Sequence, residues 1–217
     1  MNKKILKKLE LVARERQTKD DPSHDFEHIR RVLNVAIKIS KSVGADLDVV
    51  IPAALFHDTV VYRKNSPQSK NESNESAEVA ASILKKTNGY PEHKIKDVET
   101  CIRQCSFTKG IVPELLEPKV LQDADLLESM GALSIMRTFS SGGQMNRSFY
   151  NHKNPFYEKN EKDFPSGIGL FYRRLLIADT RLHTAFAKRI AKRRTSFLKK
   201  FLAQVEAELK ESGVLKV

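Results

Sequence analysis

The chain has 217 residues, of which 40% are hydrophobic and 30% charged, and its 38 Lys and Arg exceed its 27 Asp and Glu to give a net charge of +11. This composition excludes a disordered chain and is typical of a globular protein large enough to bury a core. No run approaches the roughly 18 to 20 apolar residues of a membrane span, and the N-terminal stretch lacks the apolar segment of a signal peptide. We therefore expect a soluble, cytoplasmic protein without a membrane partner.

The net charge indicates which kinds of partner to expect, and the number of cysteines indicates the cellular compartment. A strongly positive chain favours anionic partners, either nucleic acid or a phosphorylated small molecule such as a nucleotide. Much of the excess charge lies late in the chain, between Arg181 and Lys200. The two cysteines, Cys101 and Cys105, are too few for a disulfide framework, which is consistent with a reducing cytosol.

Helical periodicity begins before residue 30. Apolar residues from Ile29 to Val43 are spaced by three and four positions, as on one face of a helix, and Gly44 is expected to end that helix. A second helix is expected from about Asp48, as its cap, to about His57. Pro52 predicts a late start or a kink in this helix, because proline has no N–H for the helical ladder.

The rest of the chain also reads as helices joined by polar segments. Two segments rich in polar residues, Gly or Pro predict irregular structure, at 63–74 and from Gly142-Gly143 to about Ser166. No segment alternates with period two, and we find no internal repeat or linker. Further helices are expected over 75–87, 92–106, 118–139 and from about 186 almost to the end. The sequence therefore predicts one all-α domain spanning residues 1–217.

A histidine and an aspartate stand side by side at the end of the second expected helix, at His57 and Asp58. Adjacent helical residues point about 100° apart, so both reach one point only from a helix end or an opened turn. An imidazole nitrogen and a carboxylate oxygen are both good ligands for divalent first-row ions. The pair could equally be a buried hydrogen-bonded dyad that joins two helices, so a metal site needs further ligands from other helices.

Candidates for those ligands lie on both sides of the pair. Upstream, Asp25 and His28 are three residues apart, and His28 borders the apolar stripe, which predicts an inward side chain. Downstream, Asp123 and Asp125 are two residues apart and diverge on a helix, so only one of them can join a given site. An inward histidine can also be a hydrogen-bonded core residue, and a helical aspartate can be solvated or capping. Taken together, these residues favour a metal site.

The order His28, His57-Asp58, Asp125 resembles the H…HD…D signature of the HD superfamily of metal-dependent phosphohydrolases, whose fold is all-helical. The segments "HDFEHIRRV", "LFHDTVVYRKNSP", "ESAEVAASIL" and "LQDADLLESMGALSIMRTF" are similar to those of a bacterial group of HD hydrolases of poorly defined substrate. The likeness extends from about residue 20 to the last helix. It implies a single HD-type helical bundle over the whole chain.

The resemblance also implies a reaction and a set of residues. The expected activity is hydrolysis of a nucleotide or related phosphoester by attack of a metal-bound water on phosphorus, with Asp58 or Asp25 orienting that water. Asp125 is preferred over Asp123 because it stands at the position of the family's ligand. One divalent ion, which could be Mn, Fe, Ni, Co or Mg, is expected to be held by His28, His57, Asp58 and Asp125.

The remaining expectations concern the substrate and the alternatives. Arg31 and Lys64 are the cations nearest to the motif in sequence and are expected to bind substrate phosphate, although Arg31 could form an interhelical salt bridge and Lys64 could be solvated. The family group commonly has histidine where this chain has Cys105, which leaves open a degenerate HD module that binds a ligand without turnover. A further alternative is a nucleic-acid-binding protein that uses the basic segment "KRIAKRRTSFLKK".

Overall fold

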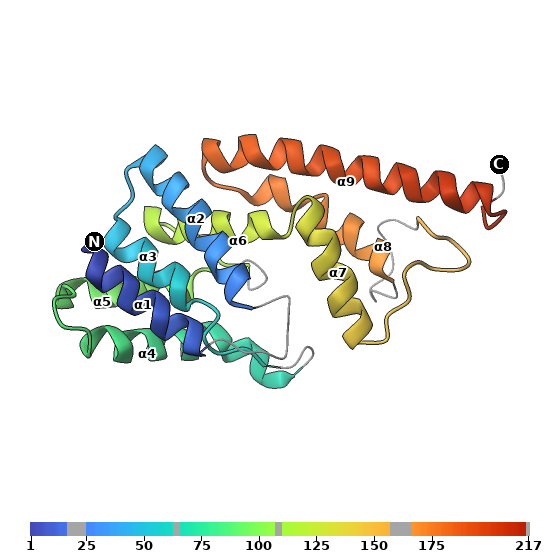
Figure 1. Ribbon diagram of the computed structural model, residues 1–217. Helices are drawn as coiled ribbons and strands as arrows, with labels where there is room; N and C mark the ends of the chain where they lie inside the picture. The colour runs from blue at the N-terminus through green and yellow to red at the C-terminus, as the bar shows by residue number, and fades with distance from the viewer. Residues whose placement is uncertain (17–24, 63–65, 107–109, 157–165, 216–217) are drawn as a thin grey trace. The chain divides into compact units, whose positions relative to one another are not determined.

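The computed structural model describes residues 1–16, 25–62, 66–106, 110–156 and 166–215 (Figure 1). This described part is all-helical, as predicted, and contains no strand beyond one isolated bridge between Ser148 and Ser166. Within it, no helix combines the length and the apolar character needed to cross a membrane. The chain separates into two compact units: unit 1 comprises residues 1–126 and 183–187, and unit 2 comprises residues 127–182 and 188–217.

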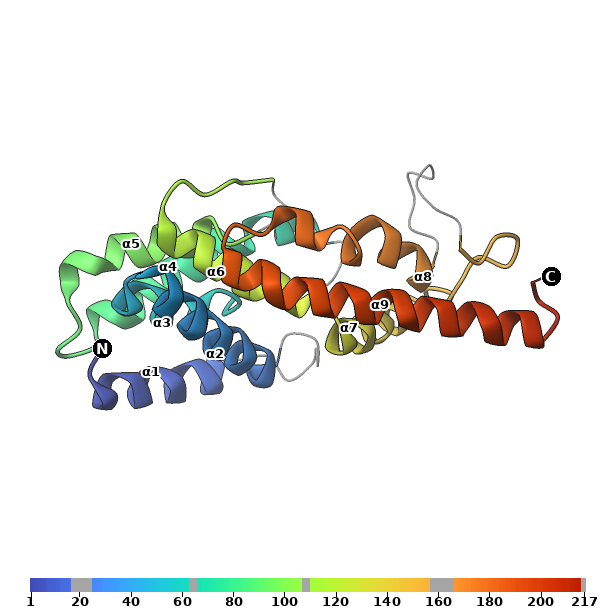
Figure 2. The same cartoon turned by 90° about the horizontal axis from the view of Figure 1, so that it is seen from above.

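Unit 1 is built around α3 (Leu47–Phe56). This helix is apolar around its whole circumference and every residue from Val49 to Phe56 is buried, which is the pattern of a central helix. Figure 2 shows α1 and α5 on opposite sides of it. The helices that pack against α3 are α1 (Lys3–Arg16), α2 (Phe26–Val43), α4 (Glu72–Lys85) and α5 (Ile95–Arg103). Most of α6 (Leu116–Glu128) and the short 3-10 helices η1 (Pro67–Asn71) and η2 (Glu92–Lys94) also belong to unit 1.

The ends of α2 follow the sequence closely. Asp25 caps its first turn by accepting a hydrogen bond from the His28 backbone N–H at 2.8 Å. Gly44 ends the helix with a φ of 77°, a conformation that glycine adopts without steric cost, and its N–H donates to the carbonyl of Ser40. The predicted end of this helix is therefore confirmed.

The start of α3 differs from the prediction. The helix begins at Leu47 with Asp46 as its cap, two residues before the expected cap at Asp48. Pro52 consequently lies inside the helix, where it cannot donate to the carbonyl of Asp48 four residues earlier. The hydroxyl of Tyr90 donates to that carbonyl instead, at 2.7 Å. A side chain from outside the helix thus replaces the missing bond.

Three other predicted boundaries were wrong. The expected helix 118–139 is two helices, α6 and α7 (Ala132–Gln144), separated at Gly131, whose φ of 79° is not helical. Gly142 and Gly143 lie inside α7 rather than opening a loop. Part of the expected polar loop forms η1 and the first turn of α4, with residues 63–65 outside the described part. These polar turns lack apolar periodicity and could not be distinguished from a loop.

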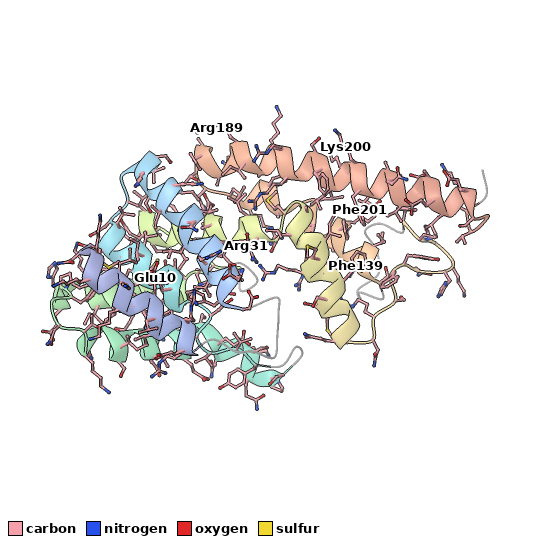
Figure 3. The ribbon with its side chains drawn as sticks, viewed as in Figure 1. Glu10, Arg31, Phe139, Arg189, Lys200 and Phe201 are labelled. Atoms are coloured by element: carbon pink, nitrogen blue, oxygen red, sulfur yellow. The ribbon has the colours of Figure 1, made fainter. Side chains whose placement is uncertain are left out.

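Unit 2 combines α7, α8 (Gly167–Leu170) and most of α9 (Ala185–Glu211), with a π-helical turn at Phe171–Leu175 and a 3-10 turn at Ala178–Arg181. Aromatic side chains pack around its mainly aliphatic core, and the rings of Phe171 and Phe201 are stacked with centroids 5.6 Å apart. Figure 3 shows Phe139 on α7 and Phe201 on α9. Its fully formed core cluster comprises Ile168, Phe171, Leu175, Leu198 and Leu202.

Candidate metal centre

The end of α3 places His57 and Asp58. His57 is the C-cap of α3 and has helical backbone geometry, and Asp58 lies in the turn that follows. Thr59 fixes this turn, because its N–H and its hydroxyl both donate to the carbonyl of Phe56, at 3.2 and 2.9 Å. The adjacent pair therefore sits at a helix end, as its spacing requires if both side chains are to reach one point.

His57 is buried and its ring is oriented by its own helix. Its Nδ1 lies 2.9 Å from the carbonyl oxygen of Ala54. A carbonyl can only accept, so Nδ1 carries the hydrogen and Nε2 is the nitrogen turned toward the carboxylates. Histidines that bind metals are commonly oriented in this way by a hydrogen bond from the other ring nitrogen.

His28 and Asp125 come from two other helices. His28 stands in the first turn of α2 and is fully buried, which agrees with its predicted inward orientation. Asp125 stands on α6 with about a third of its side chain exposed. Asp123, two residues earlier, is fully buried and accepts from the backbone N–H groups of His183 and Thr184 and from the Thr184 hydroxyl, at 2.7–2.8 Å. Asp123 therefore tethers the segment before α9 and is directed away from the cluster.

Four side chains meet at one point in unit 1. Nε2 of His28 lies 3.5 Å from Oδ2 of Asp58 and 3.5 Å from Oδ1 of Asp125. Nε2 of His57 lies 3.6 and 3.9 Å from the same two oxygens. One ligand atom from each of His28, His57 and Asp125 falls within 4.8 Å of the others, a grouping that could hold a metal ion. We call His28, His57, Asp58 and Asp125 the His–Asp cluster.

Charge shapes the cluster in the absence of an ion. Burial by itself lowers the pKa of His57, but the carboxylates of Asp58 and Asp125 outweigh it and raise the pKa to about 9. The same interaction lowers the pKa of Asp125, although burial opposes it. At neutral pH the metal-free cluster thus holds a protonated His57 against the ionised carboxylate of Asp125, and a cation is already favoured at this point.

A cavity of about 320 Å³ opens on the cluster. Glu72 on its wall accepts the backbone N–H of Tyr62 at 2.7 Å and so holds the chain that follows Asp58. Lys70, at the end of η1, brings a positive charge to the wall. The lining residues are His57, Asp58, Ser69, Lys70, Glu72, Ser73, Cys105, Ser106 and Asp125.

Among the residues that the structure describes, those predicted to bind substrate or to assist catalysis do not line the cavity, apart from Asp58. Arg31 is half-buried on α2 (Figure 3) and is not among the lining residues of this cavity, while Lys64 lies outside the described residues. Asp25 caps α2, which is its structural alternative, and its role in orienting water stays a prediction. Sequence reasoning missed Lys70, Ser69 and Ser73. The only signal for them was their position shortly after His57-Asp58, in a polar segment taken as a loop.

The chain is similar to known proteins in both sequence and structure. Among curated proteins, YpgQ of Bacillus subtilis is 28% identical over 196 residues, which are 88% of this chain and 87% of YpgQ. Among solved structures, an HD-superfamily hydrolase from Bacillus thuringiensis is 29% identical with a TM-score of 0.73, covering 95% of this chain and 97% of that one. The Lin1889 protein of Listeria innocua is 28% identical with a TM-score of 0.73 and coverage of 97% and 98%.

A structure of Bacillus subtilis YpgQ in complex with ADP shares the fold, with a TM-score of 0.71, 24% identity and coverage of 94% and 97%. The family model of the HD domain matches residues 25–130, a range that begins before His28 and ends after Asp125. The predicted resemblance is therefore confirmed. The chain belongs to the HD superfamily.

Proposed function

We propose that the protein is a metal-dependent phosphohydrolase that acts on a phosphorylated small molecule, with nucleotides as the first class to test. One observation carries this proposal: two buried histidines and two carboxylates converge from α2, the end of α3 and α6 beside a cavity. Membership of the HD superfamily, which includes the hydrolase relative from Bacillus thuringiensis, supports the reaction class.

The His–Asp cluster fits a divalent ion. Its N–O separations of 3.5–3.9 Å exceed ordinary hydrogen bonds but approach the separation of about 3.0–3.5 Å between ligands placed about 2.1 Å from a shared ion. Among the described residues, the buried Nε2 of His57 makes no hydrogen bond, as expected for a nitrogen reserved for an ion. Two nitrogens and two carboxylate oxygens suit Mn, Fe, Ni, Co or Mg.

When bound, the ion supplies Lewis acidity toward a phosphoryl oxygen and lowers the pKa of water. The residues of the chain then have separate tasks. His28, His57 and Asp125 fix the position of the charge. Asp58 both faces the histidines and lines the cavity, so its carboxylate is placed to accept a proton from an attacking water.

Lys70 gives the cavity a cation for substrate phosphate. It lies just before α4, whose first turn supplies Ser73 and Glu72 to the wall. A lysine at this place would form charge-assisted hydrogen bonds with phosphate oxygens. We therefore propose that Lys70 binds substrate phosphate, while the same role for Lys64, which lies outside the described residues, stays a prediction.

A nucleotide is supported by the cavity and by a relative. A volume of about 320 Å³ suits part of a small molecule rather than a polymer. YpgQ, which is 28% identical to this chain, has been solved with ADP. We propose a nucleoside phosphate as the substrate class.

A phosphate-release assay tests the proposal. The protein is stripped with EDTA, reloaded separately with Mn²⁺, Ni²⁺, Co²⁺ or Mg²⁺, and incubated with nucleoside mono-, di- and triphosphates. Released phosphate is measured directly and after addition of inorganic pyrophosphatase. We expect turnover with at least one ion and one nucleotide, and none in EDTA. Tight nucleotide binding without any product would instead indicate a degenerate HD module, the alternative raised by Cys105.

Asp58→Ala separates a catalytic cluster from a structural one. Because the variant loses a ligand and the oxygen that orients water, hydrolysis should fall by a factor on the order of 10² or more. In EDTA it should melt within a few degrees of the wild type, but it should lose most of the metal-induced stabilisation. Glu15→Ala, an exposed substitution on α1, is the control and should change neither property. A variant that fails to fold while the wild type shows no metal dependence would make His57-Asp58 a structural dyad.

A further inference from the structure

The positive charge of the chain is concentrated in unit 2. Unit 2 carries 17 Lys and Arg against 8 Asp and Glu, a net charge of +9, whereas unit 1 carries 21 against 19, a net charge of +2. The concentration is strongest on α9, where no acidic residue occurs from Ala185 to Val205. Charges of one sign gathered on one helix attract polyanions over a distance comparable with the Debye length.

Six residues of α9 form what we call the basic stripe. They are spaced by three and one residues in turn, so they share one face of the helix. Together they line a surface cavity of about 450 Å³. Figure 3 shows Arg189 and Lys200 on the side of α9 opposite to Phe201, which packs on the core of unit 2. The basic stripe consists of Arg189, Lys192, Arg193, Ser196, Phe197 and Lys200.

An aromatic ring stands within this charged face. Phe197 is 47% exposed, one turn from Arg193 on one side and from Lys200 on the other. The core of unit 2 does not require it, because Leu198 and Leu202 fill that side of the helix. A half-exposed ring flanked by cations is the arrangement with which proteins stack a base and hold its phosphates.

We propose that the basic stripe binds single-stranded nucleic acid, with phosphates on Lys192, Arg193 and Lys200 and a base stacked on Phe197. The stripe contains no Asn, Gln, Asp or Glu, so it offers little for reading base edges and much for the backbone. Its length, about 16 Å over eleven helical steps, suits a few nucleotides. A single strand is favoured over a duplex because only unpaired bases can stack on the ring.

This site is independent of the proposed hydrolysis. All six residues belong to unit 2, whereas the His–Asp cluster belongs to unit 1. Binding is therefore measured in EDTA, where the His–Asp cluster holds no ion. The probe is a fluorescein-labelled dT12 followed by fluorescence anisotropy over a series of KCl concentrations.

The test compares two triple variants that remove the same charge. Lys192→Gln/Arg193→Gln/Lys200→Gln should lower the affinity for dT12 at 50 mM KCl at least tenfold and reduce the slope of log K against log[KCl] by about 2, because each lost phosphate contact on a single strand contributes about 0.7. The control, Lys38→Gln/Lys41→Gln/Lys96→Gln, removes three exposed cations of unit 1 and should leave both quantities nearly unchanged.

Phe197 is tested separately. Phe197→Ala should weaken binding about tenfold with an unchanged salt slope, and Phe197→Trp should retain it, because stacking depends on the ring and not on charge. Equal losses in the two triple variants would overturn the proposal. So would a wild type that binds vesicles with 30% phosphatidylserine but not dT12, since that result would make the stripe a membrane-surface site.

Discussion

The two units differ in their net charge and in where their charged side chains lie. In unit 1 the charges nearly balance, with 21 Lys and Arg against 19 Asp and Glu, and several ionisable groups lie in the interior in paired positions. In unit 2 the net charge is +9, and the cations of α9 other than the half-buried Arg194 are exposed to solvent. Buried, paired charges can perform chemistry, whereas exposed charges of one sign act through long-range attraction. The net charge of the whole chain therefore indicates a partner and not a reaction.

The largest expected effect tests whether the carboxylates of α6 serve different purposes. Asp123→Ala leaves three donors of His183 and Thr184, two of them in fully buried bonds, without their acceptor, so we expect a loss of about 4 kcal/mol in the free energy of unfolding. Urea denaturation in EDTA measures it, with Glu15→Ala as an exposed control that should cost less than about 0.5 kcal/mol. A small effect for Asp123→Ala would place this carboxylate outside the scaffold of unit 1.

The second prediction concerns the core of unit 2. Leu198→Ala creates a cavity beside Phe171 and should destabilise the protein by about 3 kcal/mol. At a temperature where the variant remains folded, its Mn²⁺ affinity, measured by competition with a fluorescent chelator, should equal that of the wild type, because the His–Asp cluster is in unit 1. A matching loss of metal affinity would show that the two units do not have separate tasks.

The third prediction tests whether Lys70 binds substrate phosphate in the cavity of unit 1. Lys70→Gln should raise KM for the nucleotide that is turned over about 10- to 30-fold with kcat changed less than about threefold, because a charge-assisted hydrogen bond to substrate phosphate is lost in ground state and transition state alike. Lys38→Gln, an exposed change on α2, is the matched control. If kcat falls as much as kcat/KM, Lys70 acts on the transition state alone.

The fourth prediction follows from the pKa of His57. An ion needs the neutral ring, but the metal-free cluster keeps it protonated up to a pKa of about 9, so apparent metal affinity should rise about tenfold from pH 7 to pH 8 and level off above 9. Calorimetry in two buffers of different ionisation enthalpy would detect the released proton. The free energy of unfolding of the metal-free protein should change with pH in the opposite direction. The stabilisation from protonated His57 is fully present below pH 6.5 and is lost as the pH rises through 9. A flat affinity between pH 7 and 8 would contradict a protonated His57.

The smallest expected effect concerns the central helix of unit 1. Tyr90→Phe removes the hydroxyl that donates to the carbonyl of Asp48 and should cost about 1 kcal/mol by urea denaturation. Burial raises the pKa of Tyr90, so the hydroxyl remains a donor at ordinary pH. In a Pro52→Ala background, the new N–H can donate to Asp48, and Tyr90→Phe should then cost less. Equal costs in both backgrounds would mean that Tyr90 does not replace the helical bond.

Helices with a continuous apolar stripe could be predicted from the sequence, and α2 with its end at Gly44 is the clearest case. The break between α6 and α7 could not, because the apolar spacing continues across it and only the positive φ of Gly131 separates the helices. α3 was mispositioned for a related reason. Its proline is compatible with the helix interior only because of Tyr90, a residue 38 positions later that no local pattern connects to it.

The four residues of the His–Asp cluster could be named before the fold was known, because their order resembles the H…HD…D signature of the HD superfamily. Lys70 could not be recognised in advance, since it lies in a polar segment and only the fold shows that it lines the cavity. Asp123 and Asp125 were distinguished by resemblance alone. The contacts of Asp123 with Thr184, 61 positions away, provide the physical reason.

The bond between His57 Nδ1 and the carbonyl of Ala54 has a consequence for the order of assembly. It joins residues three apart within α3, so it can form as soon as that helix does, before α2 or α6 contributes a side chain. The tautomer of the imidazole is thereby decided locally, with hydrogen on Nδ1, and the proton that an arriving ion displaces is the one on Nε2. A ring without this bond could lose the proton on Nδ1 instead, and Nε2 would then keep its hydrogen and could not bind the ion.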